Sequence, residues 1–348
     1  MLTAAISVDT LAFVTKTDDN IVRINSEGYA PFEQNLDDLS FVESEAGDSK
    51  ALVKGIAKYF VDNGFNVGGF TASVTSCVPA AAGGSSSASF ELLIAEIFNV
   101  LYNDGAVSKM KKAQASQYAE NVYFLKPCGL MDQSAISLGG VSMIDFENVE
   151  NPFVLGVQYP FTDTDIVITN TGGNHADLTS DYAAIRAEME EVSEKFSEKY
   201  LRLVDYQKFL DAIPALQNEV SGRAIMRAIH FFDENLRVDK AVSAINMKNA
   251  DAFYKIVGES GDSSFKLLQN CYVPADTVQR IPLGIVLSQH VTGVKAVRVH
   301  GGGFAGTIIA FVEKAETHEY VEHMSEVFGA EHVYKLSIRQ EGACRVEF

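Results

Sequence analysis

Tryptophan is absent from the 348-residue sequence, and proline and cysteine are scarce, at 8 and 4 residues. The cysteines are far apart and form no C-x-x-C pair: Cys77, Cys128, Cys271 and Cys344. This spacing argues against a zinc site and against a disulfide framework. Reduced thiols in a cytoplasmic protein are the simplest interpretation.

Basic residues are also few, with 28 Lys and Arg against 46 Asp and Glu, which gives a formal net charge of −18. The sequence has no Lys/Arg cluster of the kind that nucleic-acid-binding proteins carry, so we expect no nucleic-acid partner. Such an acidic chain repels polyphosphates at long range. A nucleotide site would therefore have to act locally, through backbone N–H groups and a metal ion.

Long apolar runs are missing as well. No stretch approaches the roughly 18 apolar residues of a transmembrane helix, so we expect no membrane span. The first residues, MLTAAISVDTLAFVTK, have no basic lead-in and alternate like a strand, which argues against a signal peptide. We therefore expect a cytoplasmic protein.

The periodicity of the apolar residues predicts an α+β protein with two domains, residues 1–165 and 166–348. The first half has strands and helices in alternation: strands at Ala4–Thr15, Ile21–Asn25, Gly69–Cys77, Ala135–Asp145 and Asp165–Thr169, helices at Ala51–Asn63, Ser87–Tyr102 and Ser108–Val122. The second half is richer in helix: Ser180–Tyr200, Tyr206–Asp211, Ser221–Asn235, Val238–Met247, Ala250–Ser260 and Glu316–Phe328, with strands at Val294–His300, Thr307–Val312 and Val333–Ile338.

The stretch Pro79–Ser89 reads PAAAGGSSSAS and lies between a predicted strand and a predicted amphipathic helix. Small residues let the backbone approach a ligand closely, and the first turn of a helix offers N–H donors with a partial positive charge. The Walker pattern G-x-x-x-x-G-K-S/T is absent. The stretch is interpreted as a phosphate-binding loop, with a flexible Ser/Gly linker as the alternative.

A second glycine-rich stretch, Gly301–Gly306, formally matches the dinucleotide-binding pattern G-x-G-x-x-G. That pattern requires a following helix, whereas the residues that follow here, TIIAFVE, predict a strand. The stretch is therefore predicted to be a turn between two strands. Both a ligand-approaching turn and a purely structural one remain open.

Two acidic residues are candidates for chemistry. Asp132 follows a Pro/Gly turn with apolar neighbours, which suits a general base, although a helix cap is an equally simple role. Glu120 lies at the end of a predicted helix, where it could be a metal ligand or a surface charge.

Taken in order, three motifs resemble those of galactokinase, within the wider GHMP kinase family that includes mevalonate and homoserine kinases. Pro79–Ser89 is similar to P-x-G-x-G-L-S-S-S-A-S, Cys128–Gln133 (CGLMDQ) to C-G-I-M-D-Q, and Arg298–Gly306 (RVHGGGFAG) to R-M-T-G-G-G-F-G-G. The resemblance extends over essentially the whole chain. It implies a two-lobed fold, with an N-terminal ATP-binding lobe (ribosomal-protein-S5-domain-2-like) and a ferredoxin-like C-terminal lobe.

The resemblance also implies a role for each matching residue. Asp132 would act on the anomeric hydroxyl of the sugar as a base or an electrostatic positioner, and Gly129 and Tyr182 would contact the sugar. Ser87 and Glu120 would hold Mg²⁺, and Ser26 would touch ATP. The remaining ATP contacts would come from the phosphate-binding loop, at Ala81, Ala82, Gly83, Gly84, Ser85, Ser86 and Ser87.

The sequence departs from the family pattern in several places. The motif G-R-V-N-L-I-G-E-H-T-D-Y, which carries further sugar-binding residues, would lie upstream of Met1, because Leu2–Ala12 resembles the segment that follows it. Four other positions differ within the shared motifs: Ala81, Gly84, His300 and Ala305. The expected activity is ATP-dependent formation of galactose 1-phosphate by a monomer or weak dimer. The alternatives are an impaired paralogue that senses sugar or nucleotide, and a kinase for N-acetylgalactosamine or a heptose.

Overall fold

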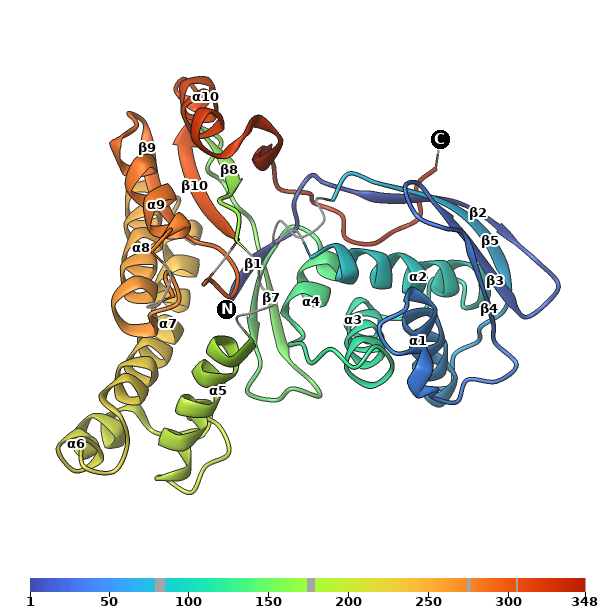
Figure 1. Ribbon diagram of the computed structural model, residues 1–348, viewed down its shortest axis with the longest axis horizontal. Helices are drawn as coiled ribbons and strands as arrows, with labels where there is room; N and C mark the ends of the chain where they lie inside the picture. Colours follow the sequence, from blue (N-terminus) through green and yellow to red (C-terminus); the bar gives the residue numbers. More distant parts are fainter. Residues whose placement is uncertain (79–84, 174–178, 274–276, 305, 348) are drawn as a thin grey trace. The chain divides into compact units, whose positions relative to one another are not determined.

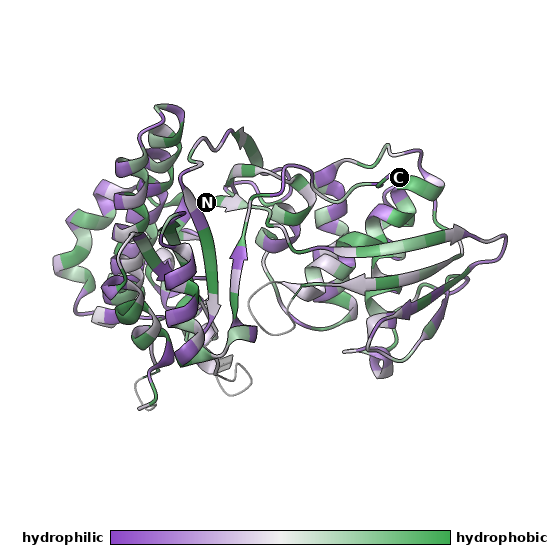
Figure 2. Ribbon diagram, turned by 90° about the horizontal axis from the view of Figure 1, so that it is seen from above, coloured by the Kyte–Doolittle hydropathy of each residue, from purple (hydrophilic) through white to green (hydrophobic). Residues whose placement is uncertain are grey.

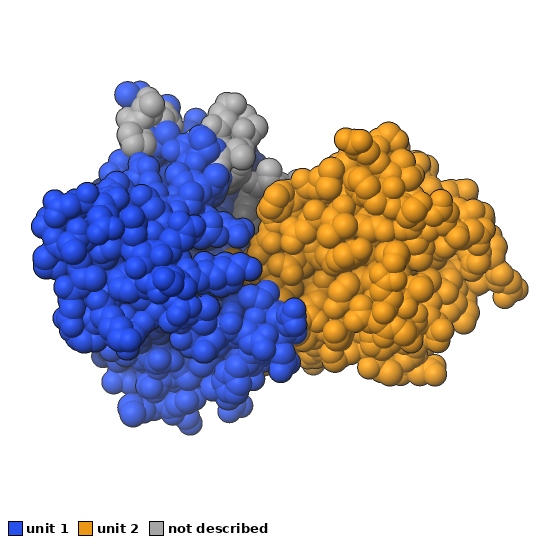
Figure 3. Space-filling model, turned by 90° about the horizontal axis from the view of Figure 1, so that it is seen from below, with its two compact units in different colours: residues 1–2, 143–337 blue, residues 3–142, 338–348 orange. Residues whose placement is uncertain are grey.

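The chain divides into two compact units, which are described one at a time (Figure 3). The computed structural model describes residues 1–78, 85–173, 179–273, 277–304 and 306–347. Unit 1 comprises residues 1–2 and 143–337, and unit 2 comprises residues 3–142 and 338–348. This division differs from the boundary expected at residue 165, because β7 (Phe153–Val157) packs with the helix α7 of unit 1 and the last residues of the chain fold with unit 2.

Unit 2 contains a four-stranded sheet of order β2-β5-β3-β4 (Figure 1). Its strands are β2 (Thr10–Lys16), β3 (Ile21–Ser26), β4 (Phe32–Asn35) and β5 (Phe70–Ser76). The pair β3/β5 is parallel, and the other neighbouring strands are antiparallel. Because parallel strands end at the same edge of a sheet, Ser26 lies at the edge from which β5 leads into residues 79–84.

Helices cover one face of this sheet. Alternation along β5 buries Phe70, Ala72 and Val74, which join the apolar residues of α1 and α2 in the core of the unit. The helical segments of unit 2 are η1 (Glu43–Glu45), α1 (Ser49–Asp62), α2 (Ser86–Tyr102), α3 (Lys109–Tyr118), η2 (Ala119–Tyr123) and α4 (Met131–Leu138).

Unit 1 contains an antiparallel sheet of order β11-β8-β10-β9. Its strands are β8 (Thr164–Asn170), β9 (Val294–Val299), β10 (Thr307–Glu313) and β11 (Val333–Leu336). A separate three-stranded sheet has the order β1-β6-β7, and the division between the units falls within its strands β1 (Leu2–Ala4) and β6 (Val141–Asp145).

The helices of unit 1 contain both hydrophilic and hydrophobic residues, as those of unit 2 do (Figure 2). They are α5 (Thr179–Glu194), η4 (Leu201–Leu203), α6 (Tyr206–Leu216), α7 (Gly222–Asn246), α8 (Ala250–Ser263), η5 (Ser264–Leu268), α9 (Arg280–His290), α10 (Thr317–Phe328) and η6 (Ala330–His332). None of the helices within the described ranges is long and apolar enough to cross a membrane.

Several predicted elements are wrong in type or extent. The single strand expected at residues 4–15 is interrupted between Ala4, which ends β1, and Thr10, which begins β2. Residues 135–138, expected at the start of a strand, form the last part of α4, and the strand begins only at Val141. Gly139 and Gly140, at φ +74° and +56°, separate the two elements. The two helices expected at 221–235 and 238–247 form the single helix α7, in which Glu234 and Arg237 make an ion pair across the expected break.

A close contact between α1 and η2 depends on Gly55. A Cβ added to Gly55 would lie 2.8 Å from both Cα and Cβ of Ala119, the first residue of η2. The helix backbone therefore approaches η2 more closely than any side chain would permit. Because η2 also carries Glu120, this contact helps to fix a residue of the candidate site.

We expect the substitution Gly55→Ala to lower the free energy of unfolding by about 1–3 kcal/mol, since the added methyl group overpacks this contact. Chemical denaturation measures the change. The matched control is Gly258→Ala in α8, where nothing lies within 4 Å of the added Cβ and the better helix propensity of alanine adds stability. Equal effects of the two substitutions would contradict the interpretation.

Candidate active site

Asp132 lies in the first turn of α4 and contacts the residue that precedes α2. The Ser85 hydroxyl donates a hydrogen bond of 2.6 Å to Oδ2 of Asp132. Ser85 itself has a left-handed backbone, with φ +55°, at the N-cap of α2. The structure thus confirms that the end of the Pro79–Ser89 stretch opens a helix, and it places the candidate base beside that helix start. Residues 79–84, and with them Ala81, Ala82, Gly83 and Gly84, lie outside the described residues.

Glu120 is buried, with 3% of its surface exposed, so it is not a surface charge. Its Oε1 accepts a hydrogen bond of 3.2 Å from the Ser87 hydroxyl group. The same oxygen forms an ion pair with the Lys126 ammonium group at 2.8 Å. Burial lowers the pKa of Lys126, but the ion pair with Glu120 outweighs it, and the pKa lies above its ordinary value. The side chains of Ser87 and Glu120, which the family resemblance implies as two ligands of one ion, are therefore adjacent.

The Gln133 side-chain amide donates hydrogen bonds to two buried carboxyl groups. Its Nε2 donates to Oε2 of Glu120 at 3.0 Å and to Oε2 of Glu91 at 3.2 Å. Glu91 and Gln133 are 0% and 1% exposed, and Oε1 of each has no hydrogen-bond partner among the described residues. Sequence reasoning did not select Glu91. The signal that could have found it is an acid in the apolar run FELLIAEIF, four residues after Ser87 and therefore on the same helix face.

Burial raises the pKa of Glu91 to about 8, and the nearby charge of Glu120 adds to the rise. Burial likewise raises the pKa of the Cys128 thiol, with a further contribution from Glu120. Both groups are consequently protonated at neutral pH, whereas Glu120 forms an ion pair with Lys126.

The raised pKa of Glu91 predicts a pH-dependent stability. The folded protein binds the proton up to about pH 8, whereas the unfolded carboxyl group titrates near 4.5. Between these values the folded state holds more protons, so the free energy of unfolding falls as the pH rises, by up to about 1.4 kcal/mol per pH unit. We expect Glu91→Gln to flatten this decrease. Urea denaturation without nucleotide or divalent cations tests it, and identical pH profiles for the two proteins would contradict it.

The turn before α4 is held by an amide side chain. Asn121 accepts from the backbone N–H of Cys128 at 2.6 Å and donates to its carbonyl oxygen at 3.3 Å. The next residue, Gly129, is exposed, and nothing lies within 4 Å of a Cβ built on it. Gly129 therefore has open space beside it, three residues before Asp132.

Tyr182 belongs to unit 1, in α5, where it packs against the glycine turn. Its hydroxyl group donates to the Gly303 carbonyl oxygen at 2.6 Å, and its ring meets that of Phe304 edge-on with centroids 5.2 Å apart. A Cβ on Gly302 would lie 2.7 Å from the Tyr182 ring. The turn joins β9 to β10, as predicted, and the dinucleotide-binding interpretation is excluded.

The backbone conformation and close packing of Gly303 also require a glycine. Its φ is +81°, and a Cβ there would lie 2.1 Å from the Asn270 carbonyl oxygen. A structural role for the glycines is thus established within unit 1. Ala305 lies outside the described residues.

Comparisons with known proteins agree with this fold. Residues 51–140 match the family model described as GHMP kinases N terminal domain. A galactokinase structure from Lactococcus lactis, complexed with galactose, superposes with a TM-score of 0.80 at 25% identity, covering 97% of this chain and 87% of that one. A mevalonate kinase structure shares the fold at 14% identity, with a TM-score of 0.64 and coverage of 98% and 92%.

Comparison with individual proteins shows to which family of kinases the chain belongs. The galactokinase of Clostridium tetani is 30% identical over 336 residues, which cover 92% of this chain and 80% of that protein. The human galactokinase is 30% identical over 297 residues, covering 84% and 71%. The fold and site thus define a GHMP kinase, an ATP-using enzyme. Within that class, the chain belongs to the galactokinase family of sugar kinases.

Proposed function

We propose that the chain transfers the γ-phosphoryl group of ATP to the C1 hydroxyl group of galactose, forming galactose 1-phosphate and ADP. The observation that carries this proposal is the hydrogen bond between Ser85 and Asp132, which joins the start of α2 to the candidate base. The choice of galactose follows the named relatives, one of which was crystallised with this sugar.

In the proposed reaction, the Asp132 carboxylate accepts the proton of the C1 hydroxyl group or holds that group in line by its charge. The sugar oxygen bonds to the γ-phosphorus, the bond from that phosphorus to the bridging oxygen breaks, and ADP leaves. Residues 81–87 would surround the phosphates, where the N-terminus of α2 favours negative charge. Ser26 would contact ATP, and Gly129 and Tyr182 the sugar.

Ser87 and Glu120 are the residues that would hold Mg²⁺. Their side-chain oxygens lie 3.2 Å apart, and a hydroxyl oxygen with a carboxylate oxygen is a donor set that suits this ion. The described residues contain no group of three or more His, Cys, Asp or Glu that could hold a metal, but Mg²⁺ in kinases keeps waters and substrate phosphates as ligands. When bound, the ion neutralises phosphate charge.

We expect Asp132→Asn to lower kcat by about 10²- to 10⁴-fold, because the amide cannot accept the proton, while stabilisation by ATP is retained. Product formation is followed by ³¹P NMR with galactose, N-acetylgalactosamine and a heptose. The control is Asp262→Asn in α8, whose side chain is 66% exposed and forms an ion pair with Lys266.

The same assay separates the alternatives. Equal rates for Asp132→Asn and the wild-type chain would remove Asp132 from the mechanism. Thermal stabilisation by galactose without turnover would favour a sensor.

We expect Glu120→Gln to raise the Mg²⁺ concentration needed for half-maximal activity by at least about ten-fold, since a charged oxygen ligand is lost. Titration of Mg²⁺ at fixed ATP measures this, and binding of Mn²⁺ by electron paramagnetic resonance gives a second readout. Glu326→Gln, at an exposed position of α10, is the control. An unchanged Mg²⁺ requirement would exclude Glu120 as a ligand.

A further inference from the structure

The C-terminal segment, residues 338–347, packs against the carboxyl end of α4. The Ala343 N–H donates to the Ile136 carbonyl oxygen at 3.2 Å. Gly342 lies so close to the helix that an added Cβ would be 2.1 Å from the Ser137 carbonyl oxygen, and a Cβ on Gly139 would be 2.3 Å from the Gly342 nitrogen. Two glycines therefore allow a backbone approach that side chains would block.

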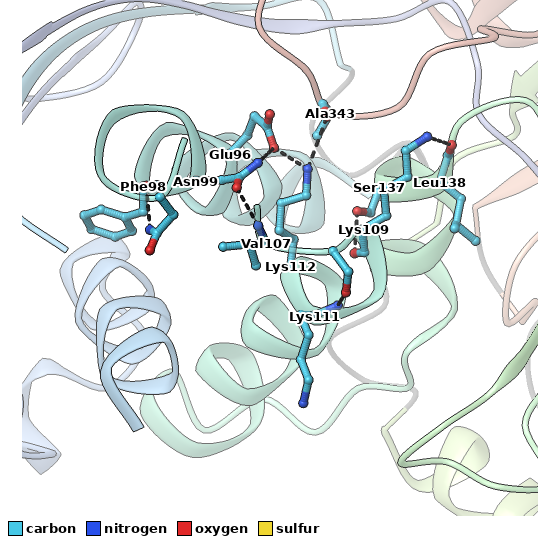
Figure 4. A network of polar contacts seen from close by, with 12 residues as sticks. Glu96, Phe98, Asn99, Val107, Lys109, Lys111, Lys112, Ser137, Leu138 and Ala343 are labelled. Atoms are coloured by element: carbon cyan, nitrogen blue, oxygen red, sulfur yellow. Dashed lines mark hydrogen bonds and ion pairs between the residues drawn. The ribbon is translucent and has the colours of Figure 1, made fainter. Parts of the chain in front are cut away.

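These contacts supply hydrogen-bond partners at the end of the helix. The last four carbonyl groups of an α-helix have no partner within the helix. In α4, the Gly139 N–H donates to the carbonyl oxygen of Ala135, and the Ala343 N–H donates to that of Ile136. The Lys109 ammonium group donates to the Leu138 carbonyl oxygen at 2.7 Å (Figure 4). The C-terminal segment thus supplies a partner that the helix itself lacks.

The segment is anchored on both sides of Gly342. Lys112, which is 3% exposed, donates to the Ala343 carbonyl oxygen at 3.4 Å and forms an ion pair with Glu96 (Figure 4). Earlier in the segment, the Arg339 carbonyl oxygen accepts from the Gly140 N–H at 2.7 Å, and the Arg339 side chain pairs with Asp9 at 3.1 Å. The segment is consequently a fixed part of unit 2.

Helix α4 is only eight residues long, too short to be stable without tertiary contacts. Ile136, where the segment binds, lies four residues after Asp132, about 6 Å along the helix axis. We propose that the C-terminal segment is a positioning element for Asp132: it fixes the carboxyl end of α4 and thereby the direction of the carboxylate at its amino end. This inference rests on the proposed function, in which Asp132 contacts the sugar hydroxyl group.

The consequence is a specific kinetic effect. A displacement of about 1 Å at a reacting group can cost about 100-fold in rate. ATP would be bound mainly by the loop before α2, so loosening α4 should change kcat more than the KM for ATP.

The first test is Gly342→Ala, whose methyl group cannot fit against Ser137. We expect kcat to fall by about 10- to 100-fold with little change in the KM for ATP. Hydrogen exchange of the α4 amides should become faster, whereas exchange in α1 stays the same. The control is Gly222→Ala, where nothing lies within 4 Å of the new Cβ.

A pair of truncations tests the same idea without a steric clash. A chain that ends at Ala343 keeps every contact with α4 described above and loses only residues 344–348, of which 344–347 are exposed. It should retain wild-type kcat. A chain that ends at Arg339 loses Gly342 and Ala343 and should behave like Gly342→Ala.

Two results would overturn the proposal. One is unchanged exchange in α4 of the Gly342→Ala and Arg339-terminated chains, and the other is unchanged kcat despite faster exchange. A fall in activity that only matches the fraction of unfolded protein also counts against positioning. Failure of the wild-type chain on galactose would refute only the proposed substrate, because kcat is compared on whichever sugar is phosphorylated and the exchange measurement requires none.

Discussion

The burial of Glu120 is the constraint on which the site depends, because a charged carboxylate removed from water must be paired. Its partners come from three other segments: Ser87 from α2, Lys126 from the turn before α4, and Gln133 from α4. The four segments therefore have a common reason to assemble, and the positions of Ser85 and Asp132 follow from that assembly.

The charge of the whole chain makes this local arrangement necessary. A net charge of −18 repels a polyphosphate at a distance. Attraction has to come from groups that act over a few ångströms, such as the N-terminus of α2 and the Lys126 ammonium group, which is 60% exposed. The glycine- and serine-rich sequence before α2 suits such short-range binding, because it places few atoms between the backbone and a ligand.

Local sequence patterns predicted the strands and helices that flank Ser85 and the turn before Asp132, since capping, turn residues and periodicity act over a few residues. They failed at α4, where the apolar spacing of eight residues fits a strand as well as a helix and tertiary contacts decide. They could not find Glu91 or the contact of Gly342 with Ser137, because burial of an acid and the meeting of residues far apart in the chain are properties of the folded unit. The pairing of Ser87 with Glu120 came only from the family resemblance.

The three acids of the site, Glu91, Glu120 and Asp132, differ in their burial and in the charged groups beside them. Glu91 is fully buried and stays neutral, so the charge of the buried Glu120 carboxylate is balanced by the largely exposed ammonium group of Lys126. A divalent cation at Glu120 would compete with Lys126 and leave an excess of positive charge. Phosphates supply the compensating negative charge, so on the proposed function the cation binds together with ATP. Asp132 is half-buried and outside this balance, so its carboxyl group remains accessible from solvent.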